Sequence, residues 1–218
     1  MIRIIMISRR GTYMNLTTIK TQLQQTQPAF IGEDSAFRSA VVVPLVEVND
    51  ELHVLFEVRS LTMRKQPGDI SFPGGKIDPT DANPQEAALR ELYEELSVPP
   101  SSVDVLSELS PLIISPTFAI YPFVAKVDIR EVNTFNRDEV AEVFTVPLNW
   151  LLECDPELHH VMMKPTPSEG FPFDKIMKGE DYEWRARAID EWFFEYNDYV
   201  IWGLTARILK YFLERIEA

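Results

Sequence analysis

The sequence predicts a single large α/β or α+β domain in which a mixed β-sheet lies between helices. Residues 39–47 are almost entirely apolar, and residues 52–59 alternate apolar and polar side chains after a short turn, so the two segments predict a hairpin. Residues 84–96 and 200–216 carry apolar side chains at helical spacing instead. Strands and helices mixed in this way along one chain are typical of a layered fold.

Shorter patterns predict the remaining elements. Strands are expected at residues 69–72, 103–113, 118–127, 139–146 and 160–164, and helical segments at residues 15–27 and 147–153. Residues 184–189 and 192–196 are expected to lead the chain back toward the last helix. No linker-like stretch or internal repeat divides the chain. We therefore expect residues 1–35 to form an N-terminal extension with a helix, and residues 36–218 to form the main domain.

The composition restricts the function classes. Of the 218 residues, 45% are hydrophobic and 25% are charged, which is typical of a soluble globular protein. The formal net charge of −13 argues against general nucleic-acid binding, which needs a basic surface. The apolar run near the N-terminus is too short for a signal peptide, no segment predicts a membrane span, and Met14 is an alternative start to Met1. Cys154 is the only cysteine, so an internal disulfide and a cysteine-rich zinc site are excluded and a cytoplasmic location is expected.

The helix at residues 84–96 has clear start and stop signals. Asn83 can act as the N-cap, and Pro84 fits the first helical position because its missing N–H costs nothing there. Glu86 can reach back to the backbone N–H of Asn83, as in a capping box. The helix is expected to end before Pro99 and Pro100, which cannot continue it.

This helix carries three carboxylates within one stretch of five residues. Glu91, Glu94 and Glu95 share an arc beside the apolar stripe, and Glu91 and Glu95 are one turn apart, so both can reach one cation. The stripe consists of Ala88, Leu89, Leu92 and Leu96. A solvated acidic face is the simpler alternative. A divalent metal is favoured because the glutamates border the core, would repel one another without a counter-ion, and follow a glycine loop.

Basic residues lie close to that glycine loop, Gly74-Gly75. They are Arg59, Arg64, Lys65, Lys76 and Arg90. They predict binding of a phosphate group, with ordinary surface positions as the alternative. Metal and phosphate together indicate phosphate chemistry.

Residues 90–98 (RELYEELSV) resemble the second half of the Nudix box, whose pattern continues from the glycine loop. Further segments are similar to the coenzyme A pyrophosphatase subfamily of the Nudix hydrolases: residues 55–60 (LFEVRS), Arg64, Gly68, residues 72–75 (FPGG), residues 138–148 and residues 201–208 (IWGLTARI). Ala82 stands where the general box has a glutamate, with Asp81 one place away. Ser97 stands where the box has a glycine, so serine is expected to adopt a left-handed helix end at a cost of about 1 kcal/mol.

The resemblance implies a Nudix α/β/α sandwich and hydrolysis of a diphosphate with Mg²⁺ or Mn²⁺. The implied substrate is coenzyme A or an acyl derivative, cut to adenosine 3′,5′-bisphosphate and a 4′-phosphopantetheine. Glu91, Glu94 and Glu95 match the family's metal ligands, and Arg90 would orient them. We expect Glu139, with Glu142 as an alternative, to serve as a general base.

Other functions and the partners remain open at this point. Arg59, Arg64, Gly74, Gly75 and Lys76 are the predicted substrate-binding residues, since a guanidinium suits phosphate recognition. Another nucleoside-diphosphate compound, such as ADP-ribose, a nucleotide sugar or NADH, is the alternative substrate. A non-catalytic nucleotide sensor is the alternative class, disfavoured because the three glutamates are present. The expected partners are a small-molecule substrate and a second copy of the chain in a homodimer. Binding to nucleic acid or to a membrane is not expected.

Overall fold

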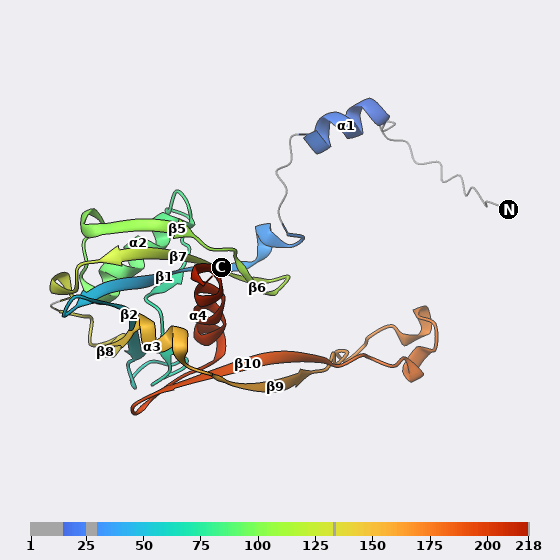
Figure 1. Ribbon diagram of the computed structural model, residues 1–218. Helices are drawn as coiled ribbons and strands as arrows, with labels where there is room; N and C mark the ends of the chain where they lie inside the picture. The colour runs from blue at the N-terminus through green and yellow to red at the C-terminus, as the bar shows by residue number, and fades with distance from the viewer. Residues whose placement is uncertain (1–14, 25–29, 133, 218) are drawn as a thin grey trace.

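The structure, a computed structural model, describes residues 15–24, 30–132 and 134–217 (Figure 1). An eight-stranded mixed sheet runs in the order β3-β2-β1-β7-β5, with β4 beside β1, β6 beside β7 and β8 beside β2. Its strands are β1 (Phe37–Val48), β2 (Glu51–Arg59), β3 (Ile70–Ser71), β4 (Gly74–Lys76), β5 (Val103–Glu108), β6 (Leu112–Ser115), β7 (Phe118–Val127) and β8 (Val140–Pro147). Strands β1 and β7 pair in parallel, and the pairs around them are antiparallel.

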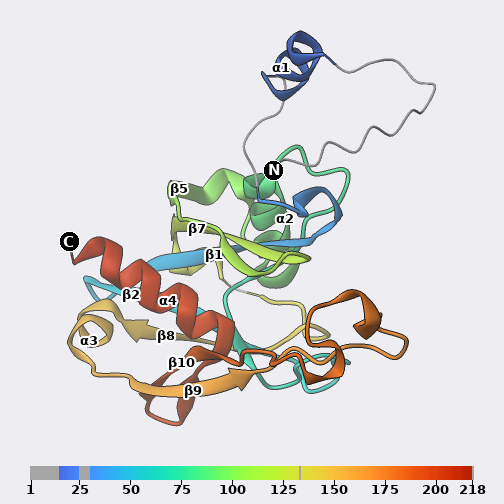
Figure 2. The same cartoon turned by 90° about the vertical axis from the view of Figure 1, so that its right-hand side faces the viewer.

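In the described ranges, four α-helices and a second, three-stranded sheet complete the fold. The helices are α1 (Leu16–Gln24), α2 (Pro84–Leu96), α3 (Leu148–Glu153) and α4 (Gly203–Ile216). The second sheet runs β11 (Tyr199–Ile201), β10 (Arg187–Tyr196), β9 (Glu157–Met163). Figures 1 and 2 show α2 and α4 on opposite sides of the layer formed by β1 and β7.

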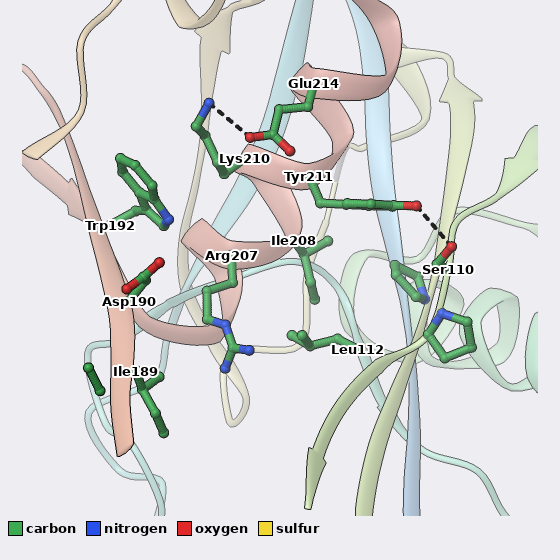
Figure 3. A pocket seen from close by; sticks show the side chains of 13 residues that line it. Ser110, Leu112, Ile189, Asp190, Trp192, Arg207, Ile208, Lys210, Tyr211 and Glu214 are labelled. Carbon is green, nitrogen blue, oxygen red and sulfur yellow. Dashed lines mark hydrogen bonds and ion pairs between the residues drawn. The ribbon is translucent and has the colours of Figure 1, made fainter. Parts of the chain in front are cut away.

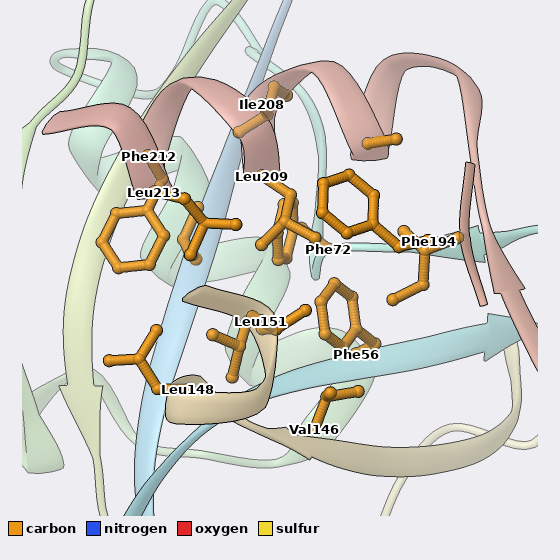
Figure 4. Close-up of a cluster of buried hydrophobic side chains, with 14 of the residues drawn as sticks. Phe56, Phe72, Val146, Leu148, Leu151, Phe194, Ile208, Leu209, Phe212 and Leu213 are labelled. Atoms are coloured by element: carbon orange, nitrogen blue, oxygen red, sulfur yellow. The ribbon is translucent and has the colours of Figure 1, made fainter. Parts of the chain in front are cut away.

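Strand β1 is buried on both faces, and its side chains point alternately into two separate hydrophobic cores. Ala40 and Val42 face α2, where they pack with Leu92 and Leu96. Val43 and Leu45 point to the other face, toward α4. The α4 core contains the larger side chains, and Figure 4 shows several of them meeting between α4, α3 and β2: Phe56, Phe72, Leu151, Phe194, Leu209 and Phe212. Full burial of each such side chain contributes roughly 1.5–3 kcal/mol.

Several predicted boundaries are wrong. The strand expected at residues 103–113 is two strands, β5 and β6. The β5 register with β7 continues to Leu109, whose N–H donates to the carbonyl of Pro122, and it is shifted by one residue where β6 begins with Leu112 opposite Ile120. The two segments at residues 184–189 and 192–196 lie mostly in one strand, β10, whose residues 187–193 pair with β9 and whose residues 194–196 pair with β11. The last helix begins at Gly203 rather than Val200, because β11 occupies the preceding residues and Trp202 is extended.

The β9–β10 hairpin extends away from the sandwich (Figure 1). Every residue of β9 is exposed, so this strand is not part of either core, whereas β10 contributes Phe194 to the α4 core. The expected helix at residues 15–27 is present as α1, Leu16–Gln24, while residues 25–27 and both alternative starts lie outside the described residues. None of the helices in the described ranges is long and apolar enough to cross a bilayer.

Candidate active site

Helix α2 begins as its sequence predicts, with one change of partner. Pro84 occupies the first turn, and Asn83 Oδ1 accepts a 2.9 Å hydrogen bond from the backbone N–H of Glu86. The Glu86 carboxylate accepts from the N–H of Ala82 at 2.6 Å, not from Asn83 as expected. Glu86 thus binds one residue further upstream, which ties the helix start to the loop that follows the glycine pair.

The C-terminal end of α2 is left-handed, as predicted for Ser97. Its φ is 59° and its ψ is 18°, and its N–H donates to the carbonyl of Tyr93 at 2.9 Å. The predicted apolar stripe is present, with two differences: Leu89 is only half-buried, while Ala87 is fully buried.

The two loop glycines lie directly against the α2 carboxylates. The N–H of Gly74 donates to Glu95 Oε2 at 2.8 Å. A Cβ added to Gly75 would lie 2.5 Å from the carboxyl carbon of Glu91. Gly75 therefore lets β4 approach the helix as closely as it does, and the loop and the glutamates form one unit.

Arg90 connects this unit to the preceding loop. Its Nε and Nη2 donate to the two carboxylate oxygens of Asp81, each at 3.0 Å. Its Nη1 donates to Glu91 at 2.8 Å and to Glu94 at 3.2 Å, and its Nη2 also donates to the carbonyl of Lys76 at 3.0 Å. The guanidinium hydrogen bonds lower the pKa of Asp81. Arg90 thus holds Glu91 and Glu94 in place, and Asp81 holds Arg90.

Two carboxylates are buried beneath the glycine loop. The exposed fraction is 3% for Glu95 and 1% for Glu57. Burial raises the pKa of Glu95 well above its ordinary value, with the neighbouring Glu57 carboxylate as the next cause. Burial also raises the pKa of Glu57 to about 7 and, less strongly, that of Glu91.

The sequence analysis missed Glu57. Its Oε1 accepts from Ser71 Oγ at 3.0 Å, and its buried Oε2 has no hydrogen-bond partner among the described residues. The signal was available in the alternation of β2, because Leu55 faces the α2 core and Glu57 is two residues further along the same face. A carboxylate on the buried face of a strand is unusual and costly unless it has a use.

The two candidates for the general base lie in different places. Glu139 is half-buried, accepts a 3.3 Å hydrogen bond from Asn136 Nδ2, and raises the pKa values of Glu57, Glu91 and Glu95 by its charge. Glu142 is exposed and accepts from the hydroxyl of Tyr199. The structure thus brings Glu139 close to the cluster of carboxylates formed by Glu57, Glu91 and Glu95, and it leaves Glu142 outside this cluster.

The carboxylates fit a divalent cation by their chemistry. In the described part of the chain, no three His, Cys, Asp or Glu side chains are already arranged as a metal site. Glu91 and Glu94 are hydrogen bonded to Arg90. The buried carboxylates of Glu57 and Glu95 nevertheless have no cation paired with them in any described ion pair. Oxygen-only donors are those preferred by Mg²⁺ and Mn²⁺.

A cleft of about 370 Å³ opens on the other side of the glycine loop, toward α4. Arg59, Gly74 and Gly75 line it, as do Phe118 and Trp202. In the described ranges, Arg59 Nε is buried without a hydrogen-bond partner, and so is Oε2 of Glu191, which lines the same cleft.

Two of the predicted substrate-binding residues are not in this cleft. Arg64 is exposed in the turn after β2. Lys76 is also exposed and forms a 3.6 Å ion pair with Asp78. The glycine loop and Arg59 are therefore the part of the predicted substrate site that the fold gathers around one cavity.

Comparison with known proteins agrees with this arrangement. The model of the NUDIX domain matches residues 36–184. The uncharacterized Nudix hydrolase NudL of Yersinia enterocolitica is 33% identical over 210 residues, which cover 96% of each chain. The mouse peroxisomal coenzyme A diphosphatase NUDT7 is 33% identical over 174 residues, covering 80% of this chain and 68% of that protein.

The chain belongs to the Nudix hydrolase family. The predicted fold class is confirmed, as is the resemblance to the coenzyme A pyrophosphatase subfamily. Members of this family hydrolyse diphosphate bonds and generally require a divalent metal ion, which agrees with the carboxylate group beside the glycine loop.

Proposed function

We propose that this protein is a coenzyme A diphosphatase. It would hydrolyse the diphosphate of coenzyme A or its acyl derivatives to adenosine 3′,5′-bisphosphate and a 4′-phosphopantetheine, with Mg²⁺ or Mn²⁺ as cofactor. One observation carries the proposal. The buried carboxylates of Glu57 and Glu95, and a cleft lined by Arg59, whose Nε has no partner in the described ranges, meet at the same glycine pair. The similarity to the mouse coenzyme A diphosphatase supports the choice of substrate.

The proposed function gives the residues of α2 two roles, metal binding and positioning of the metal ligands. Glu91, Glu94 and Glu95 would hold the metal, which would neutralise diphosphate charge and lower the pKa of a bound water. Arg90 is the positioning residue, because it contacts Glu91 and Glu94 and is itself fixed by Asp81.

The remaining residues handle the proton and the diphosphate. The Glu139 carboxylate, at the edge of the group, would take a proton from the attacking water. The guanidinium of Arg59, whose Nε has no partner in the described ranges, would bind diphosphate oxygens.

Two other functions remain as alternatives. A Nudix hydrolase for ADP-ribose, a nucleotide sugar or NADH would use the same carboxylates and differ only in the cleft. A nucleotide sensor without catalysis would have no need of them. We favour catalysis because burial of Glu57 and Glu95 is costly without a cation, and a sensor would gain nothing from it.

The test is a substrate panel. The protein is incubated with Mg²⁺ or Mn²⁺ and, separately, with coenzyme A, acetyl-coenzyme A, ADP-ribose, NADH and nucleoside triphosphates, and products are identified by mass. We expect coenzyme A or its acyl form to be cleaved with the highest kcat/KM, and EDTA to abolish cleavage. Equal cleavage of ADP-ribose and coenzyme A would overturn the substrate assignment. Cleavage of none of them would favour the sensor.

A further inference from the structure

A second cavity, of about 560 Å³, lies beside the first along α4 (Figure 3). Its walls come from α4, from β10 and from the segment around β6, and the apolar part includes Leu112, Ile189 and Trp192. Ile208 lines both this cavity and the cleft at the glycine loop. The two cavities therefore lie on either side of one side chain, so one extended ligand can occupy both.

Arg207 is the charged group of this second cavity that has no partner among the residues that the structure describes. Lys210 pairs with Glu214 at 3.2 Å and lies over the ring of Trp192. Asp190 is hydrogen bonded to His160 at 3.0 Å. No hydrogen bond or ion pair joins Arg207 to any other described residue, and Figure 3 shows its guanidinium projecting into the cavity between β10 and Leu112.

The position of Arg207 is fixed relative to the glycine loop. Thr205 Oγ1 donates to the carbonyl of Ile70 at 3.0 Å, which ties the first turn of α4 to β3, the strand that leads into Gly74. Arg207 follows Thr205 by two residues, or about 3 Å of helix rise. A ligand whose diphosphate lies at the glycine loop can thus extend past Ile208 toward the guanidinium.

We propose that Arg207 binds a second phosphate of the substrate, a phosphate monoester that is separate from the diphosphate. For coenzyme A this is the 3′-phosphate, so the assignment rests on the proposed function. A planar guanidinium can hold two oxygens of a phosphate monoester at once. Apolar neighbours on both sides weaken screening by water, which strengthens the attraction. Arg207 is then a specificity residue that distinguishes coenzyme A from nucleotides without the extra phosphate.

The experiment crosses two substrates with two variants. Coenzyme A and 3′-dephospho-coenzyme A are compared in the wild-type protein, in Arg207→Gln and in Arg215→Gln, whose side chain is exposed near the end of the same helix. We expect Arg207→Gln to lower kcat/KM for coenzyme A about tenfold or more, mostly through KM, and to leave the dephospho substrate unchanged. Arg215→Gln should change neither.

A binding measurement separates this inference from the proposed reaction. Isothermal titration with adenosine 3′,5′-bisphosphate and with adenosine 5′-monophosphate should show a preference for the bisphosphate that Arg207→Gln removes. If the wild-type protein keeps this preference but cleaves no coenzyme A, the proposed function fails and the phosphate site stands. If Arg207→Gln affects both substrates equally, or changes binding of both nucleotides equally, the phosphate site is overturned. Arg207→Lys, which retains the charge, provides the second variant should Arg207→Gln fail to fold.

Discussion

The two faces of the central sheet carry opposite chemistry. On the α2 face, Glu57 and Glu95 are buried side by side with raised pKa values. On the α4 face, the two adjoining cavities contain cationic groups without partners among the described residues, Arg59 Nε and Arg207. The glycine pair lies between them. Under the proposed function, the reaction and the recognition of its substrate would therefore use opposite sides of one layer.

The two helices show the same contrast. Helix α4 buries only apolar side chains: Ala206, Ile208, Leu209, Phe212 and Leu213. Helix α2 has nearly the same length but includes Glu95 among its buried residues. An apolar residue at position 95 would serve the fold better, since burial of a carboxylate is unfavourable. Under the proposed function, Glu95 is therefore the residue of this helix at which metal binding would outweigh stability.

The largest effect on activity is expected from a change at Glu95, one of the two buried carboxylates on the α2 face of the sheet. Glu95→Gln removes the charge but keeps an oxygen that can accept from the N–H of Gly74, so the fold should persist. Because even outer-shell partners of a metal site are worth about 10–100-fold, loss of a proposed ligand should lower kcat by at least about 100-fold. Steady-state kinetics and circular dichroism measure the two properties.

Glu86→Gln is the matched control for this variant. It lies on the same helix, and its amide oxygen can still accept from Ala82, so turnover should stay near the wild-type value. Full activity in Glu95→Gln would remove this residue from the site.

The next effect concerns stability and pH. Because the pKa of Glu57 is raised to about 7 in the folded protein, the folded state binds more protons than the unfolded state between the ordinary glutamate value and about 7. Stability without divalent ions should therefore fall as the pH rises through this interval. Glu57→Gln, whose oxygen can still accept from Ser71, should remove that fall and be more stable at pH 8 by up to about 3 kcal/mol.

Urea unfolding at pH 4.5 and pH 8, in EDTA, checks this prediction. Exposed Glu142→Gln on the adjacent strand is the control and should leave the pH dependence unchanged. Added Mg²⁺ should stabilise the wild-type protein more than Glu57→Gln, because the ion relieves the repulsion that the variant has already lost. An unchanged stability profile for Glu57→Gln would mean that the acidic face is not strained.

Helix α2 and its carboxylates could be predicted from the sequence better than the two cavities. The helix at residues 84–96 could be predicted with its N-cap, Asn83, and its left-handed end, Ser97, because caps and helical periodicity depend on a few neighbouring residues. Glu57 required knowledge of which face of β2 meets α2, which depends on pairing between distant strands. Arg207 required a helix, a hairpin and β6 to meet, and its sequence neighbours indicated only core packing.

The smallest effect is expected from a change at Ser97, which tests whether the conformation of the C-terminal end of α2 affects the positions of the glutamates. Ser97 is left-handed, a conformation that costs serine about 1 kcal/mol and glycine almost nothing. Ser97→Gly should therefore raise the free energy of unfolding by up to about 1 kcal/mol, or the melting temperature by roughly 2–4 °C. Turnover should not change, since the exposed side chain forms no described hydrogen bond and the backbone bond to Tyr93 remains. Ser101→Gly, at an exposed position without positive φ, should instead destabilise slightly. A rise in kcat of Ser97→Gly would show that the strained helix end, and not only Arg90, controls where Glu94 lies.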